Sequence, residues 1–119
     1  MCGFAAEFSY AKSAPPVSLA RLRKASAAMT ARGPDGAGEW ISADGCVGMV
    51  HRRLAILDLS ESGSQPMATS DGSTRIVFNG EIYNFLELRE QLKRKGYEFR
   101  SRVIPRSCCI YIRNAALTW

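Results

Sequence analysis

Apolar residues recur with a helical period in some segments and form short continuous or alternating runs in others, which predicts a mixture of helices and strands. Residues 3–10 are rich in apolar and aromatic side chains and predict a strand. A helix is predicted after Ser18, which can cap it. Its inner stripe is formed by Leu19, Leu22, Ser26 and Met29. Gly33-Pro34 is expected to stop this helix.

The middle of the chain predicts short strands and loops. Strands over residues 39–42 and 46–50 are expected to form a hairpin, because Asp44-Gly45 between them is a strong turn signal. Residues 54–59 form another apolar run, and turn-forming residues predict a loop over residues 61–73.

A further short strand over residues 75–79 is predicted to lead into a second helix that begins after Asn84. Glu87, three positions after Asn84, completes a pattern like a capping box. The inner face of this helix is formed by Phe85, Leu88 and Leu92. Gly96 is expected to end it. Because strands, helices and hairpin turns are interspersed, the sequence favours the α+β class.

Composition is that of one small globular domain: 119 residues, 46% hydrophobic and 23% charged. A membrane-spanning run and a secretory leader are both absent from the sequence, so we expect a cytoplasmic protein with no membrane partner. The net charge is +5, but residues 101–119 hold three arginines and no acidic residue. The basic residues do not form the clustered face that binds nucleic acid, so no nucleic-acid partner is expected.

The cysteines do not predict a metal site. They are Cys2, Cys46, Cys108 and Cys109. No two of them have Cys-x-x-Cys spacing, and His51 is the single histidine in the sequence.

Cys2 has a possible chemical role because of where it stands. Removal of Met1 would leave a cysteine with both a thiol and a free α-amine, and such an amine can activate its own side chain as a nucleophile. The alternative is an initiator methionine followed by an incidental cysteine.

Two further motifs have possible polar roles. Asn79-Gly80 lies between a predicted strand and a predicted helix, where the amide and the Gly80 N–H could stabilise a developing oxyanion; the alternative is an ordinary turn with a helix cap. Arg52 and Arg53 adjoin an apolar run, where one guanidinium could bind a carboxylate; the alternative is an exposed pair beside a core strand.

Together, the motifs resemble class II glutamine amidotransferases, and the asparagine synthetase (glutamine-hydrolysing) branch fits best. In order they are Met-Cys-Gly, Arg-Gly-Pro-Asp-Gly-x-Gly, His-Arg-Arg-Leu-Ala-Ile-x-Asp-Leu, Gln-Pro-Met and Asn-Gly-Glu-Ile-Tyr-Asn. The resemblance implies an N-terminal-nucleophile hydrolase fold, an αββα four-layer sandwich. It implies hydrolysis of glutamine to glutamate and ammonia, which a synthetase domain with ATP and Mg²⁺ uses to amidate an acid such as aspartate. It implies no cofactor for the glutaminase part itself.

The resemblance also implies a role for each matching residue. Cys2 is the nucleophile, and Asn79 with the Gly80 N–H forms the oxyanion hole. Arg53 binds the α-carboxylate of glutamine, and Glu81 helps to hold its α-amino end. The backbone that lines the pocket comes from Leu54, Ala55, Ile56 and Leu57. Residues 32–38 are expected to build the site rather than to take part in chemistry.

The resemblance covers about residues 1–102 and then stops. Members of the family continue with an Asp that binds the substrate ammonium, whereas this chain has no acidic residue after Glu98. Back-translation of residues 103–119, with third bases chosen freely and read one frame over, gives the family-like Asp-Thr-Glu-Val-Leu-Leu. The sequence therefore predicts a frameshifted tail over residues 103–119, with a genuine divergent C-terminus as the alternative.

We expect an incomplete sandwich without a synthetase domain, and therefore a chain that folds poorly and is inactive. Two other classes of function stay open. The chain could be a non-catalytic pseudogene-like fragment or small binding domain that keeps only affinity for glutamine, or a basic module that binds nucleic acid.

Overall fold

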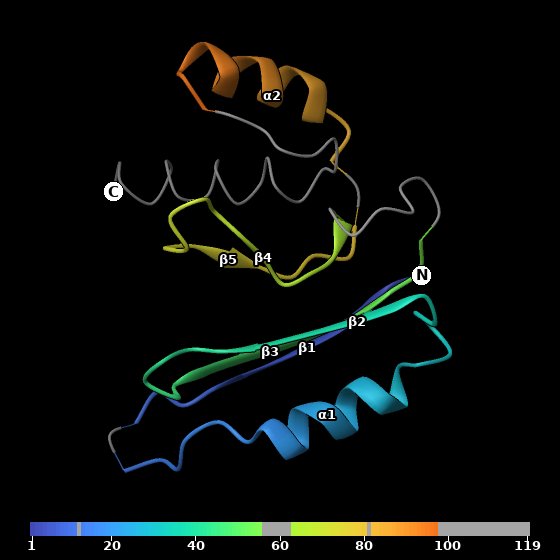
Figure 1. Cartoon of the computed structure of the whole chain (residues 1–119), viewed down its shortest axis with the longest axis vertical. Coiled ribbons are helices and arrows are strands. Elements are labelled where there is room, and N and C mark those ends of the chain that lie inside the picture. Colours follow the sequence, from blue (N-terminus) through green and yellow to red (C-terminus); the bar gives the residue numbers. More distant parts are fainter. Residues whose placement is uncertain (12, 56–62, 81, 98–119) are drawn as a thin grey trace.

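A computed structural model describes residues 1–11, 13–55, 63–80 and 82–97 of the chain. The tail over residues 103–119, for which the sequence predicts a shifted reading frame, lies outside the described residues. Within the described part, two helices accompany two separate antiparallel sheets, which confirms the α+β class (Figure 1).

Three antiparallel strands form the main sheet, in the order β1-β3-β2. They are β1 (Gly3–Phe8), β2 (Gly36–Ile41) and β3 (Val47–Arg53). The predicted hairpin at Asp44-Gly45 is confirmed, although both strands are longer than the sequence indicated. Gly45 turns the chain with a φ of 68°, and the Asp44 carboxylate accepts a hydrogen bond from the Cys46 N–H at 3.0 Å. A left-handed φ of this kind suits glycine, which has no Cβ to clash.

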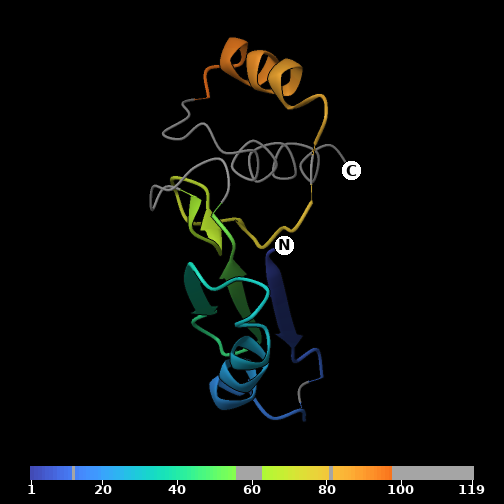
Figure 2. The ribbon, with the colours of Figure 1, turned by 90° about the vertical axis from the view of Figure 1, so that its right-hand side faces the viewer.

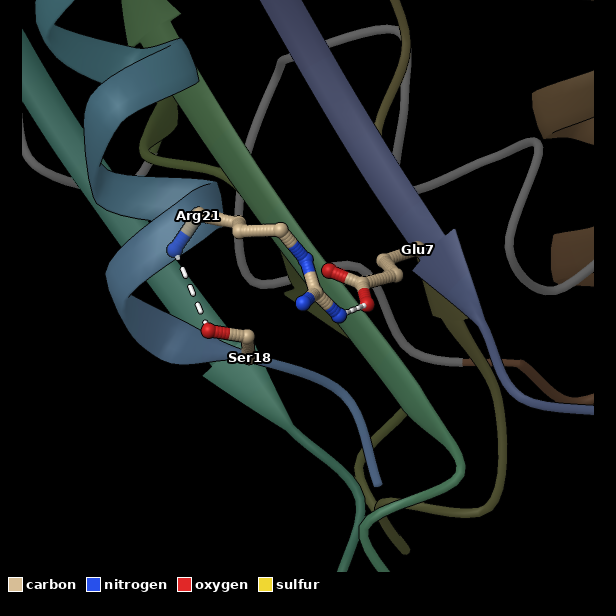
Figure 3. A network of polar contacts seen from close by, with 3 residues as sticks. All are labelled: Glu7, Ser18 and Arg21. Carbon is tan, nitrogen blue, oxygen red and sulfur yellow. Dashed lines mark hydrogen bonds and ion pairs between the residues drawn. The ribbon is translucent and has the colours of Figure 1, made fainter. Parts of the chain in front are cut away.

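Helix α1 (Leu19–Ala28) covers one face of this sheet. The Ser18 side chain caps its start by accepting a hydrogen bond from the Arg21 N–H, as predicted, and Arg21 pairs with Glu7 of β1 (Figure 3). The hydrophobic core between helix and sheet is formed by Val17, Leu22 and Val50. Burial of this apolar surface is what holds α1 on the sheet.

Helix α1 ends earlier than the sequence indicated. Met29 is its C-cap, so the prediction that Gly33-Pro34 stops the helix is wrong by about one turn. The carbonyls of the last turn find partners outside the helix: Arg52 Nε donates to the Ser26 carbonyl at 3.1 Å. The Thr30 hydroxyl donates to the Ala27 carbonyl at 2.8 Å. The same two carbonyls also accept bonds from the Met29 and Thr30 N–H groups at 3.0 and 3.1 Å, so the chain tightens into i→i+3 bonds at the helix end.

A small second sheet lies on the other side of the main sheet from α1 (Figures 1 and 2). It consists of β4 (Met67–Ala68) and β5 (Arg75–Ile76), with Met67 opposite Ile76. The guanidinium of Arg75 lies over the Trp40 ring of β2, 4.7 Å from its centroid. A cation–π contact therefore joins the two sheets.

Both strands of the small sheet differ from the prediction. Strand β4 lies inside residues 61–73, which the sequence indicated as a loop. Strand β5 covers two residues rather than the predicted residues 75–79. The strand pairing stops early because the backbone of Phe78 is hydrogen-bonded to the side chain of Gln65 instead of to a strand.

Helix α2 (Phe85–Arg94) lies beyond the small sheet, at the end of the molecule opposite α1 (Figure 1). Asn84 is its N-cap but makes no side-chain capping bond, so the predicted capping box does not form. Gly96, with a φ of 87°, follows the helix end as expected. From one end of the described part to the other, the elements thus follow in the order α1, main sheet, small sheet and α2 (Figure 1).

A pair of alanine substitutions in β2 tests the close approach of the two sheets. A Cβ on Gly38 would lie 1.9 Å from the Gln65 carbonyl oxygen, whereas a Cβ on Gly36 meets its nearest neighbour at 3.5 Å. We expect Gly38→Ala to lower the free energy of unfolding by at least about 1–3 kcal/mol, because backbone must shift. The control Gly36→Ala is expected to be neutral or slightly stabilising. Denaturant unfolding measures the free energy of unfolding of both variants. Equal values for Gly38→Ala and Gly36→Ala would contradict the close approach of the two sheets.

Candidate functional site

Strand pairing places Cys2 beside the end of β3. Gly3 lies opposite Arg52 in the register, so the residue before Gly3 adjoins the residues that follow Arg52. The Leu54 N–H donates to Cys2 Sγ at 3.3 Å, and the thiol donates to the Leu54 carbonyl at 3.7 Å. Both backbone groups of one residue therefore hold the half-buried thiol of Cys2 in a fixed place.

Asn79 approaches Cys2 from the segment that follows β5. Its Nδ2 donates a hydrogen bond to the Cys2 carbonyl oxygen at 2.8 Å. An amide nitrogen carries two hydrogens, so this bond uses one and leaves the other for a second acceptor. The neighbouring Gly80 is exposed, and a Cβ there would lie 2.9 Å from the Phe78 ring. The structure therefore brings the Asn79 amide to the backbone of Cys2, and Gly80 follows Asn79 directly in the chain.

The two neighbouring arginines face opposite sides of the main sheet. Arg52 points to the α1 side, where its Nε donates to the Ser26 carbonyl at 3.1 Å and to the Ser26 hydroxyl at 3.0 Å. Arg53, one residue on, points to the side of Cys2 and lies against Gly63; a Cβ on that glycine would be 2.5 Å from the guanidinium. Arg53 is therefore the arginine on the side where a substrate of Cys2 would lie.

A loop before β2 holds the backbone next to the thiol. The Asp35 N–H donates to the Arg53 carbonyl at 3.0 Å, and the Asp35 carboxylate accepts from the Ala55 N–H at 2.8 Å. A Cβ on Gly33 would lie 2.5 Å from the Arg52 carbonyl carbon, so this loop runs directly against β3. The sequence assigned residues 32–38 to building the site but did not single out Asp35.

Several predicted site residues lie outside the described residues: Ile56, Leu57 and Glu81. Leu54 and Ala55 are described, and their backbone groups bond to Cys2 and Asp35. Gln65 is a second residue that the sequence analysis did not single out. Gln65 belongs to the Gln-Pro-Met motif, but the motif assigned it no role of its own. Its bonds to the Phe78 backbone are visible only in the folded chain.

His51 lies on the same side of the main sheet as Arg53 and is 1% exposed. Its Nε2 has no hydrogen-bond partner among the described residues. Burial, with a smaller contribution from the charge of Arg53, holds the pKa of His51 below its ordinary value. The imidazole is therefore kept neutral, which fits a packing role.

Neither helix of the described part is long and apolar enough to cross a membrane. In the same part of the chain, no cluster of His, Cys, Asp and Glu side chains is arranged to hold a metal ion.

Comparison with known families identifies the family of this chain. The profile of a family described as Glutamine amidotransferase domain matches residues 1–103, which is most of the chain. The chain belongs to this family of glutamine amidotransferase domains. The resemblance predicted from the motifs is thereby confirmed at the level of the family.

The matching proteins are much longer than this chain. An asparagine synthetase (glutamine-hydrolysing) of Bacillus subtilis is 43% identical over 102 residues, which cover 85% of this chain and 16% of the relative. An asparagine synthetase of Saccharomyces cerevisiae is 47% identical over 57% of this chain and 11% of its own length. A protein of Gibberella zeae named Amidase chry2 is 46% identical over 51% of this chain and 9% of its own length. No solved structure matches the chain.

The lowered pKa of His51 predicts how the stability of this amidotransferase domain depends on pH. Unfolding frees the imidazole to bind a proton below about pH 6.5, whereas the folded chain resists protonation. We therefore expect the stability advantage of wild type over His51→Gln to shrink as the pH falls from 8 to 5.5, by at most about 1.4 kcal/mol per pH unit. Denaturant unfolding at several pH values measures this difference, and parallel curves for the two proteins would contradict it.

Proposed function

We propose that this site hydrolyses glutamine to glutamate and ammonia, with the Cys2 thiol as nucleophile. The observation that carries the proposal is the convergence of the Cys2 thiol, the Leu54 backbone and the Asn79 amide from three separate parts of the chain. Membership of the glutamine amidotransferase family supports glutamine as the substrate.

The chemistry begins at the N-terminus. Once Met1 is removed, the α-amine of Cys2 takes the proton of its own thiol, and the thiolate attacks the side-chain amide carbon of glutamine. The negative charge on the former carbonyl oxygen is stabilised by the second Asn79 N–H and by the Gly80 N–H. The amine returns its proton to the leaving nitrogen, ammonia departs, and water hydrolyses the thioester to give glutamate.

Substrate binding is proposed on the same side of the main sheet. Arg53 binds the α-carboxylate of glutamine through its planar guanidinium, as carboxylate recognition often requires. The backbone of residues 54–57 lines the pocket, and Glu81 holds the α-amino end. Asp35 stabilises the start of this backbone segment, because its carboxylate accepts a hydrogen bond from the Ala55 N–H.

The proposed fold is the N-terminal-nucleophile hydrolase sandwich. The succession of α1, main sheet, small sheet and α2 supports it, since this is the αββα order of layers (Figure 2). The tail over residues 103–119 is proposed to come from a shifted reading frame, which removes the family's ammonium-binding Asp. The match to the family over residues 1–103 supports the boundary.

The ammonia is proposed to serve an ATP-dependent amidation in the cytoplasm. The chain spans between 9 and 16% of the length of the three relatives described above, and two of them are named asparagine synthetases. The acceptor would be aspartate or another acid, activated with ATP and Mg²⁺ on a synthetase domain. The proposed hydrolysis of glutamine uses neither ATP nor Mg²⁺.

Replacement of the nucleophile is the first test. Glutamate release should be measured for the chain as it stands and for a form in which residues from 103 onward follow the shifted frame of the family. We expect turnover in the second form. Cys2→Ala is expected to abolish it, and Cys2→Ser to leave little, because an alkoxide forms far less readily than a thiolate.

Mass spectrometry of the N-terminus accompanies this test, because a retained Met1 blocks the α-amine. Turnover by Cys2→Ala at the wild-type rate would remove Cys2 from the mechanism. Glutamine binding without turnover by either wild-type form would instead favour a small binding domain. Salt-dependent binding of DNA would be needed to support the nucleic-acid alternative.

The neighbouring arginines supply a matched pair for substrate binding. Arg53→Lys is expected to weaken glutamine binding about tenfold or more, because lysine cannot reproduce the planar two-point contact with a carboxylate. Arg52→Lys is the control: it disturbs the bond to Ser26 on the α1 side and should change stability rather than affinity. Isothermal titration with glutamine distinguishes them, and weaker binding in Arg52→Lys alone would reverse the assignment.

A further inference from the structure

A buried side-chain amide connects the small sheet to the segment that carries Asn79. Gln65 is 8% exposed and lies just before β4. Its Oε1 accepts a hydrogen bond from the Phe78 N–H at 2.6 Å, and its Nε2 donates to the Phe78 carbonyl at 3.0 Å. One side chain thus bonds both backbone groups of Phe78, which is the pairing that a neighbouring strand would otherwise supply.

This pairing fixes the backbone immediately before the oxyanion residues. Strand β5 ends at Ile76, so Phe78 lies beyond the paired part of the strand. Asn79 follows directly, and its amide reaches the Cys2 carbonyl at 2.8 Å. A change in the backbone at Phe78 would therefore move the Asn79 amide and the Gly80 N–H relative to the thiol.

Gln65 is itself held in place by the main sheet. The Gln65 carbonyl lies so close to β2 that a Cβ on Gly38 would be 1.9 Å from it. A continuous set of contacts thus runs from Gly38 through Gln65 and Phe78 to Asn79 and Cys2. Within the described part of the chain, the Gln65 side chain bonds to the Phe78 backbone and not to the thiol, so we expect its effect on the reaction to pass through Phe78.

We propose that Gln65 is a positioning residue for glutamine hydrolysis: it holds the Phe78 backbone so that Asn79 and Gly80 stay aligned on the oxyanion formed at Cys2. The inference rests on the proposed function for its chemical consequence, but the geometric part can be tested without it. Oxyanion donors act on charge that develops in the transition state, so misplacing them lowers kcat while glutamine binding is retained. A purely structural glutamine would instead lower stability and leave the kcat of the folded fraction unchanged.

Amide hydrogen exchange tests the geometry on the chain as it stands. In wild type, the Phe78 amide should be protected although it lies outside the strands. Gln65→Glu keeps an acceptor but loses the donor to the Phe78 carbonyl, and Gln65→Ala loses both bonds. We expect the Asn79 side-chain amide resonances to move toward free values in both variants, and Phe78 protection to fall further in Gln65→Ala.

Thr69→Val is the matched control. Thr69 is 7% exposed, similar to Gln65, and its hydroxyl accepts a hydrogen bond from the Thr74 N–H at 3.1 Å in the turn between β4 and β5. Its loss should expose the Thr74 amide to exchange and leave Phe78 and Asn79 unchanged. The Thr69→Val variant therefore measures how much stability is lost when a buried polar group of the small sheet is removed at a position away from Cys2.

Steady-state kinetics test whether Gln65 affects glutamine hydrolysis. They are measured in the form that turns over glutamine, either the chain as it stands or the form with the shifted frame from residue 103. Gln65→Glu is expected to lower kcat about 10- to 100-fold with KM within about threefold, because misplacing a catalytic group by about 1 Å has an effect of this size. Alkylation of Cys2 by iodoacetamide passes through no oxyanion, so its rate should not change. Thr69→Val should keep the wild-type kcat.

Each outcome decides the proposal. An unprotected Phe78 amide in wild type, or Asn79 resonances unchanged in both Gln65 variants, would overturn it. A wild-type kcat in a folded Gln65→Glu variant would overturn it as well. If neither wild-type form hydrolyses glutamine, the proposed function fails, and the exchange experiment alone decides whether Gln65 positions Asn79.

Discussion

Cys2 reaches Leu54 because β1 and β3 run antiparallel with Gly3 opposite Arg52. This register brings the first residues of the chain to residues more than fifty positions later, and it fixes which backbone groups the thiol meets. A shift of one residue would turn the Cys2 side chain to the α1 side of the sheet. The other contacts of the site, from Asn79 and from the Asp35 loop, are made to this pair of strand ends.

Alternation along β3 places its side chains in turn on the α1 side and on the Cys2 side of the sheet. Val50 and Arg52 point toward α1, where one joins the core and the other bonds to Ser26. His51 and Arg53 point the other way, toward Gln65 and Cys2. The same side-chain period thus places two adjacent arginines on opposite faces of the sheet, which their shared chemistry alone would not reveal.

Side chains replace strand pairing at the places where the site needs irregular backbone. Gln65 bonds both polar groups of Phe78, and Asp35 accepts from the Ala55 N–H just after β3 ends. These bonds satisfy backbone groups that a buried loop would otherwise leave unpaired, at a cost in stability. Glycines at positions 33 and 38 make the close approaches possible, since a Cβ at either would overlap neighbouring backbone. The segments around Cys2 are therefore held firmly without belonging to regular strands.

The sequence by itself determined most of the local elements and predicted which residues form the site. Periodicity and turn residues predicted β1, α1, the hairpin at Asp44-Gly45 and α2, because strand alternation, capping and left-handed glycines are local properties. The motifs predicted Cys2, Asn79, Gly80 and Arg53 as partners, and the fold brings the first three into contact or adjacency.

Tertiary structure decided what depends on residues distant in the sequence. Arg52 bonds to the Ser26 carbonyl at the end of α1, and the Gln65 side chain bonds the backbone just after the short β5; neither partner is near in the sequence. The capping box at Asn84 did not form, although its residues were suitable. Neither Asp35 nor Gln65 has a local signal for its role, since each acts on backbone that only folding brings near. The sequence shows that such residues are present. Their contacts depend on tertiary structure, because the partners lie far away in the sequence.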